Sequence, residues 1–524
     1  MEAVRAVKKC GFQDRDFARV FVVLCIAFGP MVFIGAISEL DRAQFRGVLT
    51  QELSLFSIAK HILGGSWAAG LQSDSWLVMN KAIIFLSTGA HDRLYEELFF
   101  KSGVRFQYPP SSLIGIELLS AVGIRKFQTL NELNSFLYII NSIVVGIICW
   151  DVARTHYDCE TSVSRRASSL VRSPAFALAI AAGCSVYVFY PIVRAQLLGQ
   201  IQVWIDLLYS GAVLFWLRSQ RYAAGLLIGL ACTIKPQLGL LIVWGILWGE
   251  RRFVLGAIST FVPVMILAVF RYGVHNNIEY LRVLSFLSQV GEGYFANNSF
   301  NGVLHWYFGG ENYLVWMAQT FPKPNNIVTI GSAFASFVFL SLLFIPGLVR
   351  DGRAPSPSEF FAATICSVVS SPVAWEHHYG ILLPVFVYLV AAELGPIKSR
   401  EAAPMMTLRR TAIFISWVLV SSFIPFTSLL VGTPLSLLAA NFLIGALILL
   451  VVLRSEKPDV FTPLVASTYA TLNLILRRFQ AFTPNVANQV PSSDFAPTIQ
   501  MLEVSPGGPD HPDQGPNFLR KLPL

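Results

Sequence analysis

Residues 225–252 read GLLIGLACTIKPQLGLLIVWGILWGERR, and this stretch decides how the rest of the chain is interpreted. Two apolar pieces, 222–234 and 237–248, flank a Lys-Pro-Gln triplet at 235–237. Each is shorter than the about 20 residues that a single helical crossing needs. One long helix over both pieces would place the Arg pair at 251–252 on the outer side, against the tendency of basic residues to stay cytoplasmic. We therefore predict two short legs that turn at Lys235.

The composition is that of a membrane protein. Of 524 residues, 54% are hydrophobic and 13% are charged, and the mean hydropathy is +0.58. A soluble domain has roughly 25% charged residues. The apolar residues form continuous blocks instead of alternating, which favours helices that satisfy their own backbone hydrogen bonds in lipid. We expect an all-α polytopic membrane protein.

The apolar blocks predict about twelve transmembrane helices. The clear spans are 17–38, 132–152, 174–191, 197–217, 253–270, 327–349, 378–395, 411–430 and 433–453. The pieces at 222–234, 237–248 and 359–372 are ambiguous in length, and counting them gives twelve spans with both termini on one side. The first block follows a Lys pair at 8–9 and is longer than the apolar core of a cleaved signal peptide, so we interpret it as an uncleaved anchor.

Basic residues between the blocks fix the expected orientation. With the N-terminus in the cytoplasm, nearly all of them fall on the inner side. This accounts for the net charge of +8 without a nucleic-acid partner. Residues 1–457 would form the transmembrane domain, with long extracytoplasmic loops at 39–131 and 271–326. The polar, Pro-rich segment 458–524 would be a disordered cytoplasmic tail.

A set of ionisable, amide and aromatic side chains falls on the outer side of this topology. Its members are Asp74, Tyr108, Arg194, Gln200, Lys235, Asn298, Asn301, His305, Trp375, Glu376, His377 and His378. Polar groups at membrane helices are costly and mark functional sites, so we expect a shared extracytoplasmic cavity. One carboxylate can act as a general base, while Arg, Lys and His stabilise a departing phosphate. This combination suits the transfer of a sugar that is carried on a lipid phosphate.

Five motifs, in order along the chain, carry a resemblance to a known family. They are Tyr108-Pro109-Pro110, Gly199-Gln200, the block 225–252, Asn298-Ser299-Phe300-Asn301-Gly302, and Ser371-Pro372 with Trp375-Glu376-His377-His378. They resemble the Y-P-P, G-Q, G-L-x-x-G-L-x-x-x-K-P-Q-L-G-L-L, N-x-S-x-N-G and S-P-x-x-W-E-H-H motifs of glycosyltransferase family 87. The resemblance covers most of residues 70–395.

The resemblance implies a GT-C fold and a polyprenyl-phosphate-sugar donor, often mannose, with inversion at the anomeric carbon. The acceptor would be a glycolipid or glycan, and the enzyme would work in the bilayer of a cell inner membrane, with its active site on the extracytoplasmic side. No cofactor or metal is expected. An Asp in the first outer loop would be the base, which points to Asp74. That Asp usually follows the first helix more closely, so Asp41 remains an alternative.

The remaining residues receive roles from the same comparison. Donor phosphate contacts are expected from Lys235, Arg194, His305, His377 and His378. The substrate cavity is expected to include Tyr108, Gln200, Asn298, Asn301, Trp375 and Glu376.

Other interpretations compete with these roles. Asp74 would cap a helix, Lys235 would snorkel at a helix end, and Arg194 would anchor the chain at the interface. The two adjacent histidines would be partners of Glu376 or metal ligands. At the level of function, the alternatives are a transporter or lipid flippase, which favours internal repeats, and a non-catalytic scaffold.

Overall fold

The computed structural model describes residues 73–88, 92–157, 174–310, 313–317, 320–349, 352–393, 403–424 and 427–455. All of them belong to one compact unit, Met1–Val460. The predicted first span at 17–38, the alternative base Asp41 and the predicted tail at 458–524 lie outside the described residues. In the described part the regular structure is helical, with one isolated bridge between Asn297 and Trp375.

The described elements follow one another as short and long helices. In chain order they are α4 (Asp74–Ser87), the π-helical η1 (Tyr95–Lys101), α5 (Ser112–Ala121), α6 (Phe127–Tyr157), α7 (Pro174–Ser185), α8 (Tyr190–Leu197), α9 (Gln202–Leu217), α10 (Arg221–Ile234), the 3-10 turn η4 (Pro236–Gly239), α11 (Leu240–Trp248), α12 (Arg251–Tyr272), α13 (Val274–Val290), α14 (Phe300–Phe308), α15 (Asn326–Leu348), α16 (Pro357–Val369), the 3-10 turn η5 (Glu376–Leu382), α17 (Leu383–Glu393), α18 (Ala403–Ser421), the 3-10 turns η6 (Thr427–Leu430) and η7 (Ser436–Ala439), and α19 (Asn441–Arg454).

Several helices have the length and composition of membrane spans. Among the described residues, three are long and apolar enough to cross a bilayer: Phe127–Arg154 of α6, α12 and α15. The pair α7 and α8, bent by 44°, would be a fourth if it is one span. Shorter apolar helices such as α9, α10, α16 and α19 accompany them. The chain is therefore a helical membrane protein, while the count of twelve spans stays a prediction.

Some predicted spans are interrupted. The sequence predicts a continuous span at 174–191, but α7 ends at Ser185 and α8 begins at Tyr190. Pro191 stands in the first turn of α8, where its missing N–H costs nothing. The extended residue at the break is Phe189, the N-cap of α8, with φ −76° and ψ 101°. In the same way η5 replaces the start of the predicted span 378–395. The predicted outer loop 271–326 contains the helices α13 and α14.

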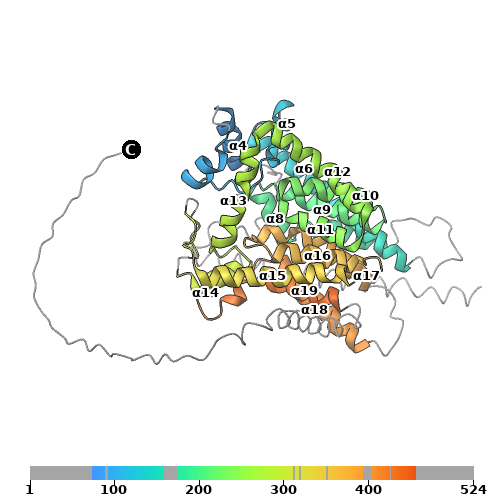
Figure 1. Ribbon diagram of the computed structural model, residues 1–524. Helices are drawn as coiled ribbons and strands as arrows, with labels where there is room; N and C mark the ends of the chain where they lie inside the picture. Colours follow the sequence, from blue (N-terminus) through green and yellow to red (C-terminus); the bar gives the residue numbers. More distant parts are fainter. Residues whose placement is uncertain are drawn as a thin grey trace, which may run out of the picture. The chain divides into compact units, whose positions relative to one another are not determined.

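The predicted turn at Lys235 is confirmed by the packing of α10 on α12. A Cβ on Gly225 would meet the carbonyl oxygen of Phe253, and one on Gly229 would meet that of Ala257, so the backbones nearly touch. The contacts advance in the same direction along both helices, which makes α10 and α12 parallel. The intervening α11 must therefore run back, and Figure 1 shows α10 between α9 and α12.

This arrangement defines two ends of the helix assembly. The Arg221 end holds the start of α10 and the end of α11, where Arg221 Nε lies 3.7 Å from Glu250 Oε2. The Lys235 end holds the turn between α10 and η4 and the start of α9, where Lys235 Nζ donates to Gln202 Oε1 at 3.2 Å. Lys235 itself has extended geometry, with φ −134° and ψ 92°, because Pro236 follows it.

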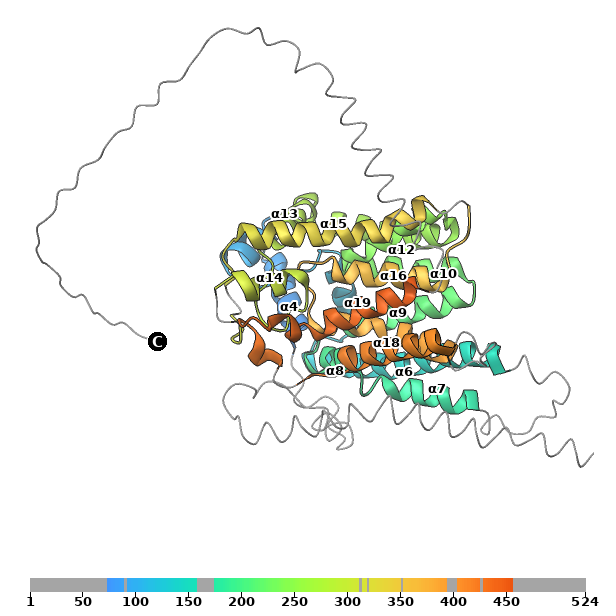
Figure 2. The same cartoon turned by 90° about the horizontal axis from the view of Figure 1, so that it is seen from below.

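The other long elements pack in layers around this group. Helix α6 packs on α7, α9 and α17, whereas α16 packs on α15 and α19, and α19 packs on α18. Figure 2 shows α15, α16, α19 and α18 following one another. Segments far apart in the sequence are thus brought together at the Lys235 end.

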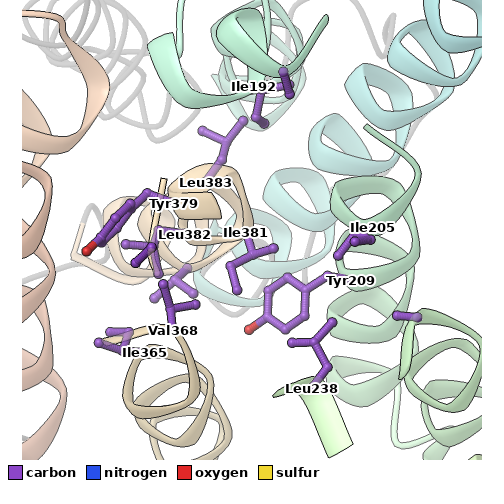
Figure 3. Close-up of a cluster of buried hydrophobic side chains, with 14 of the residues drawn as sticks. Ile192, Ile205, Tyr209, Leu238, Ile365, Val368, Tyr379, Ile381, Leu382 and Leu383 are labelled. Carbon is purple, nitrogen blue, oxygen red and sulfur yellow. The ribbon is translucent and has the colours of Figure 1, made fainter. Parts of the chain in front are cut away.

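A buried apolar cluster fixes the segment that carries the Trp-Glu-His-His motif. Figure 3 shows its members converging from α8, α9, η4, α16, η5 and α17: Ile192, Ile205, Tyr209, Leu238, Ile365, Val368, Tyr379, Ile381, Leu382 and Leu383. Within it, Tyr209 OH donates to Thr364 Oγ1 at 2.9 Å. Close packing of this kind leaves η5 little freedom to move, so Glu376 and the two histidines are held in place.

The glycine contact between α10 and α12 predicts a stability effect. Gly225→Ala puts a Cβ against the carbonyl oxygen of Phe253, closer than van der Waals contact allows, and overpacking of this kind costs about 1–3 kcal/mol. We expect a lower thermal unfolding temperature for the purified protein in detergent. Gly239→Ala is the matched control, because nothing lies within 4 Å of its Cβ position. Equal unfolding temperatures for the two variants would contradict the close approach.

Candidate functional site

A cavity of about 980 Å³ lies at the Lys235 end. Most of the residues that the sequence assigns to a site line its wall: Asp74, Tyr108, Arg194, Gln200, Lys235, Trp375, Glu376, His377 and His378. They come from α4, the segment before α5, α8, the start of α9, the α10–η4 turn and η5. The cavity therefore assembles residues from separate parts of the chain, as the sequence predicts.

The carboxylate of Asp74 stands at the N-terminus of α4. Ser73 is the N-cap residue and makes no side-chain cap bond, so Asp74 is the first helical residue and does not cap the helix. Its backbone N–H donates to Leu198 O at 3.0 Å. The indole of Trp76 donates to Asn131 Oδ1 at 2.8 Å and ties α4 to α6. A negative charge is favourable at a helix N-terminus, and the backbone bond holds this one beside the cavity.

A small hydrogen-bond network connects Asp74 to Gln200, Ser75 and Tyr108. Ser75 Oγ donates to Gln200 Oε1 at 2.7 Å, accepts from the N–H of Ile201 at 3.0 Å, and lies 2.8 Å from Tyr108 OH. Gln200 Nε2 then donates to Asp74 Oδ2 at 3.4 Å. Burial raises the pKa of Tyr108 to about 12, so this phenol remains a protonated donor. The Tyr-Pro-Pro and Gly-Gln motifs thus meet through Ser75.

The protonation of Asp74 is set by opposing influences. Surrounding protein raises the pKa of the carboxyl above the ordinary value of an aspartate, although the charge of Arg194 and the hydrogen bond from Gln200 lower it. The side chain itself remains exposed within the cavity. A carboxylate with a raised pKa is a stronger proton acceptor than an ordinary aspartate. Asp74 therefore has the access and the basicity that a general base needs.

Arg194 and Glu376 form a largely buried ion pair beside Asp74. Arg194 Nε lies 3.7 Å from Glu376 Oε2, with the two side chains 12% and 4% exposed. The hydroxyl of Tyr190 donates to the same carboxylate oxygen at 3.1 Å. This burial does not fit a simple interfacial anchor for Arg194. It also leaves Asp74 as the more accessible carboxylate, because Glu376 is already paired and enclosed.

Lys235 belongs to a chain of polar groups that leads into the protein. Its Nζ donates to Gln202 Oε1, and Gln202 Nε2 donates to Asp206 Oδ1 at 2.9 Å. Asp206 is only 1% exposed, and its negative charge attracts Lys235. The ammonium group is thus directed into the cavity wall instead of snorkelling toward a membrane surface.

Asp206 was not found by sequence reasoning. It lies inside the predicted span 197–217, where the apolar pattern hides it. The available signal was an acidic residue within a membrane helix, which is a functional hypothesis by default.

His377 and His378 line the cavity together with Lys235 and Arg194. Their rings meet edge to face with centroids 4.7 Å apart, so the two imidazoles point in different directions. His378 Nδ1 accepts from the backbone N–H of Trp375 at 3.2 Å. Within the described residues no group of three or more His, Cys, Asp or Glu could hold a metal ion.

Three predicted site residues lie elsewhere. Asn298, Asn301 and His305 are buried, and they do not line the cavity. His305 Nε2 lies 2.7 Å from Val290 O, Asn301 Nδ2 donates to Ser332 Oγ at 3.0 Å, and the carbonyl of Asn298 accepts from Tyr379 OH. These hydrogen bonds join the three residues to neighbouring segments, and a ligand contact by any of them stays a prediction.

The cavity also has an apolar side. Leu240 and Val243 from α11, Leu284 and Leu287 from α13, and Leu340 from α15 contribute to its wall. Val243 is 42% exposed and Leu284 is 38% exposed. A ligand with both a charged group and a hydrocarbon chain would find complementary surfaces in this one cavity.

A comparison with family models gives an independent finding. Residues 106–374, just over half of the chain, match the model of glycosyltransferase family 87. The match contains Tyr108, Arg194, Gln200 and Lys235, whereas Asp74 precedes it and the Trp-Glu-His-His motif follows it. No curated protein matches the chain.

The polar chain from Lys235 to Asp206 predicts energetic coupling. Lys235→Met and Asp206→Asn should each lower the thermal unfolding temperature, since each leaves the other group without its opposite charge. The double variant should lose less than the sum of the two, with a coupling of about 0.5–3 kcal/mol. Unfolding of all four proteins in the same detergent measures this. Strict additivity would show that the two charges do not interact.

Proposed function

The chain belongs to glycosyltransferase family 87, and from this premise we propose that it transfers a sugar from a polyprenyl-phosphate donor to a glycolipid or glycan acceptor. The observation that carries the proposal is the composition of the cavity. One accessible carboxylate, Asp74, shares it with the cations Arg194 and Lys235 and with a row of apolar side chains. A membrane glycosyltransferase with a lipid-linked donor requires these three kinds of surface together.

The donor phosphate fits the cationic side. Lys235 and Arg194 supply positive charge, and His377 and His378 supply further hydrogen-bonding nitrogens. Charge-assisted hydrogen bonds to phosphate are among the stronger polar contacts in proteins. Glu376, which pairs with Arg194, and Asp206, which Gln202 links to Lys235, offset part of this charge. The site would therefore hold an anionic group without an excess of buried positive charge. The polyprenyl chain would lie along Leu240, Val243 and Leu284.

The chemical step then follows from the two sides of the cavity. Asp74 takes the proton of an acceptor hydroxyl as the hydroxyl oxygen attacks the anomeric carbon from the face opposite the phosphate. The bond from that carbon to the phosphate oxygen breaks, and its electron pair leaves with the polyprenyl phosphate. Lys235 and Arg194 stabilise the negative charge that gathers on the departing oxygen. A single displacement of this kind inverts the configuration at the anomeric carbon.

The support for the finer assignments comes from the sequence. The distribution of basic residues favours a cavity that opens on the extracytoplasmic side of a cell inner membrane. The family resemblance favours mannose as the sugar. Family membership also favours transferase chemistry over a transporter or flippase, and over a non-catalytic scaffold.

Asp74→Asn should abolish most of the transfer. Removing a general base lowers rates by about 10²–10⁴-fold, measured here as radiolabelled mannose moved from polyprenyl-phosphate-mannose into membrane lipid at matched expression. Because the base works in its ionised form and its pKa is raised, the wild-type rate should rise with pH through a midpoint above that of an ordinary aspartate.

Two controls accompany this variant. Asp151→Asn removes a carboxylate at the Arg221 end, where Asp151 pairs with Arg218 at 2.6 Å, and should leave transfer near the wild-type rate. Asp41→Asn tests the alternative base. Full transfer by Asp74→Asn with loss in Asp41→Asn would contradict the assignment of Asp74.

A further inference from the structure

Three aromatic side chains that the proposed chemistry does not use meet at one part of the cavity. Tyr294, Trp316 and Trp375 all line it, and we call them the aromatic wall. The ring centroids of Trp316 and Trp375 are 5.3 Å apart, those of Tyr294 and Trp316 are 5.4 Å apart, and those of Tyr294 and Trp375 are 6.4 Å apart. The rings come from three separate segments, so the fold brings them together.

A buried ion pair holds the segment that carries Trp316. Arg105 pairs with Glu292, and both side chains are at least nine-tenths buried. The guanidinium also donates to the backbone carbonyls of Met317, at 2.8 Å, and of Thr320. Its Cζ lies 4.2 Å from the centroid of the Trp316 ring. Arg105 thereby positions this indole at the cavity.

Trp375 is fixed by its backbone. It forms a bridge with Asn297, and its N–H donates to His378 Nδ1. The aromatic wall is therefore connected to η5, the element that carries Glu376 and both histidines. A ligand that contacts the wall would therefore be held at a fixed position relative to Glu376 and the two histidines.

The exposure of the aromatic wall differs from that of an aromatic core. Trp316 keeps 39% of its surface exposed, although Arg105 lies against its ring. At the Arg221 end, by contrast, Trp216 and Trp244 are each 1% exposed and pack against one another. The rings of the wall meet at 58° to 77°, so they contact by edges instead of stacking face against face. Ring surface is thus left for a ligand.

The chemistry of the wall selects an uncharged ligand with an apolar face. An aromatic face is apolar and carries partial negative charge, which suits the polarised C–H groups on one side of a sugar ring. The charge of Arg105 is balanced by Glu292 and its guanidinium already occupies a cation–π position, so the wall offers little to a phosphate or to a second cation. A neutral sugar matches these features best.

We propose that the aromatic wall binds a neutral sugar ring of the acceptor, so that the enzyme extends a molecule that is already glycosylated. This inference rests on the proposed glycosyltransferase function. The donor sugar is attached to the phosphate and must lie between Lys235 and Asp74, whereas Trp316 is at a part of the cavity that is accessible from outside the protein. An acceptor arriving from the aqueous side would meet this indole.

Direct binding without any donor tests the proposal. The full chain in lipid nanodiscs is titrated with a panel of neutral methyl glycosides and disaccharides, namely mannosides, glucosides and galactosides, and saturation-transfer NMR reports the bound ring protons. We expect at least one glycoside to bind, with contacts on its C–H face. Trp316→Ala and Trp375→Ala should each weaken its affinity about tenfold, as truncation of a buried aromatic anchor does.

Matched variants separate ring contact from lost packing. Trp316→Leu removes the aromatic face but keeps apolar volume, and should bind as weakly as Trp316→Ala, whereas Trp316→Phe should retain most of the affinity. Phe337→Ala removes an aromatic side chain that is 68% exposed on α15 and does not line the cavity, and should bind as the wild type does. Unfolding temperatures identify any variant that fails to fold.

The outcomes distinguish the two proposals. No binding by the wild type, or equal binding by wild type and both folded Trp→Ala variants, would overturn the sugar-binding wall, even if transfer from polyprenyl-phosphate-mannose proceeds. Ring-dependent glycoside binding together with no transfer from any lipid-linked sugar would leave the wall in place and count against the proposed reaction instead.

Discussion

Pro236 has no backbone N–H and restricts the residue before it. The chain reverses direction at this point, and the turn lines the cavity. The parallel contact of α10 with α12 leaves α11 no course except the return from the Lys235 end to the Arg221 end. A proline inside a helix kinks it, whereas a proline with an extended residue before it permits a reversal. The reversal places Lys235 at the end of two helices, next to the start of α9, so that its ammonium group reaches the cavity instead of a membrane surface.

The other half of the site depends on how the segment before α6 is attached. Ser75 connects α4 to Gln200 and Tyr108, and the backbone of Asp74 is bonded to Leu198. At the far side of the same segment, Asn276 and Glu279 of α13 accept from the backbone N–H groups of Leu94 and Tyr95. Apart from the bond between Ser75 and Tyr108, these hydrogen bonds join residues that are more than a hundred positions apart. They make the position of the carboxylate a property of the helix assembly, and not of a free loop.

The basic side chains of the cavity are each connected to an acidic side chain of the protein. Asp74 feels the positive charge of Arg194, but Arg194 is committed to Glu376. Lys235 is linked through Gln202 to Asp206. Each basic side chain therefore lines the cavity and is connected to a buried acidic side chain. Preorganised charge of this kind can stabilise a departing phosphate without rearrangement of the protein.

Charge distribution and motif spacing were sufficient to predict the turn at Lys235 and the grouping of Asp74 with Tyr108, Gln200 and Lys235. Polar residues at membrane helices are costly unless they face the protein interior or a water-filled cavity, which limits their positions. The same reasoning missed Asp206, which an apolar span conceals. It assigned His305 to the cavity because a polar loop does not reveal which face of a short helix is turned inward. Trp316 could not be anticipated either, since its position depends on the long-range pairing of Arg105 with Glu292. Breaks such as that between α7 and α8 depend on tertiary packing that hydropathy does not report.

The most direct test of the central claim is a structure of the full chain in a nanodisc with a non-hydrolysable polyprenyl-phosphonate analogue of the donor. The account predicts the phosphonate within hydrogen-bond distance of Lys235 or Arg194, with the open face of the anomeric carbon directed toward Asp74 and the hydrocarbon chain along Leu240 and Val243. A phosphonate bound elsewhere, or an anomeric carbon whose open face is directed away from Asp74, would contradict it.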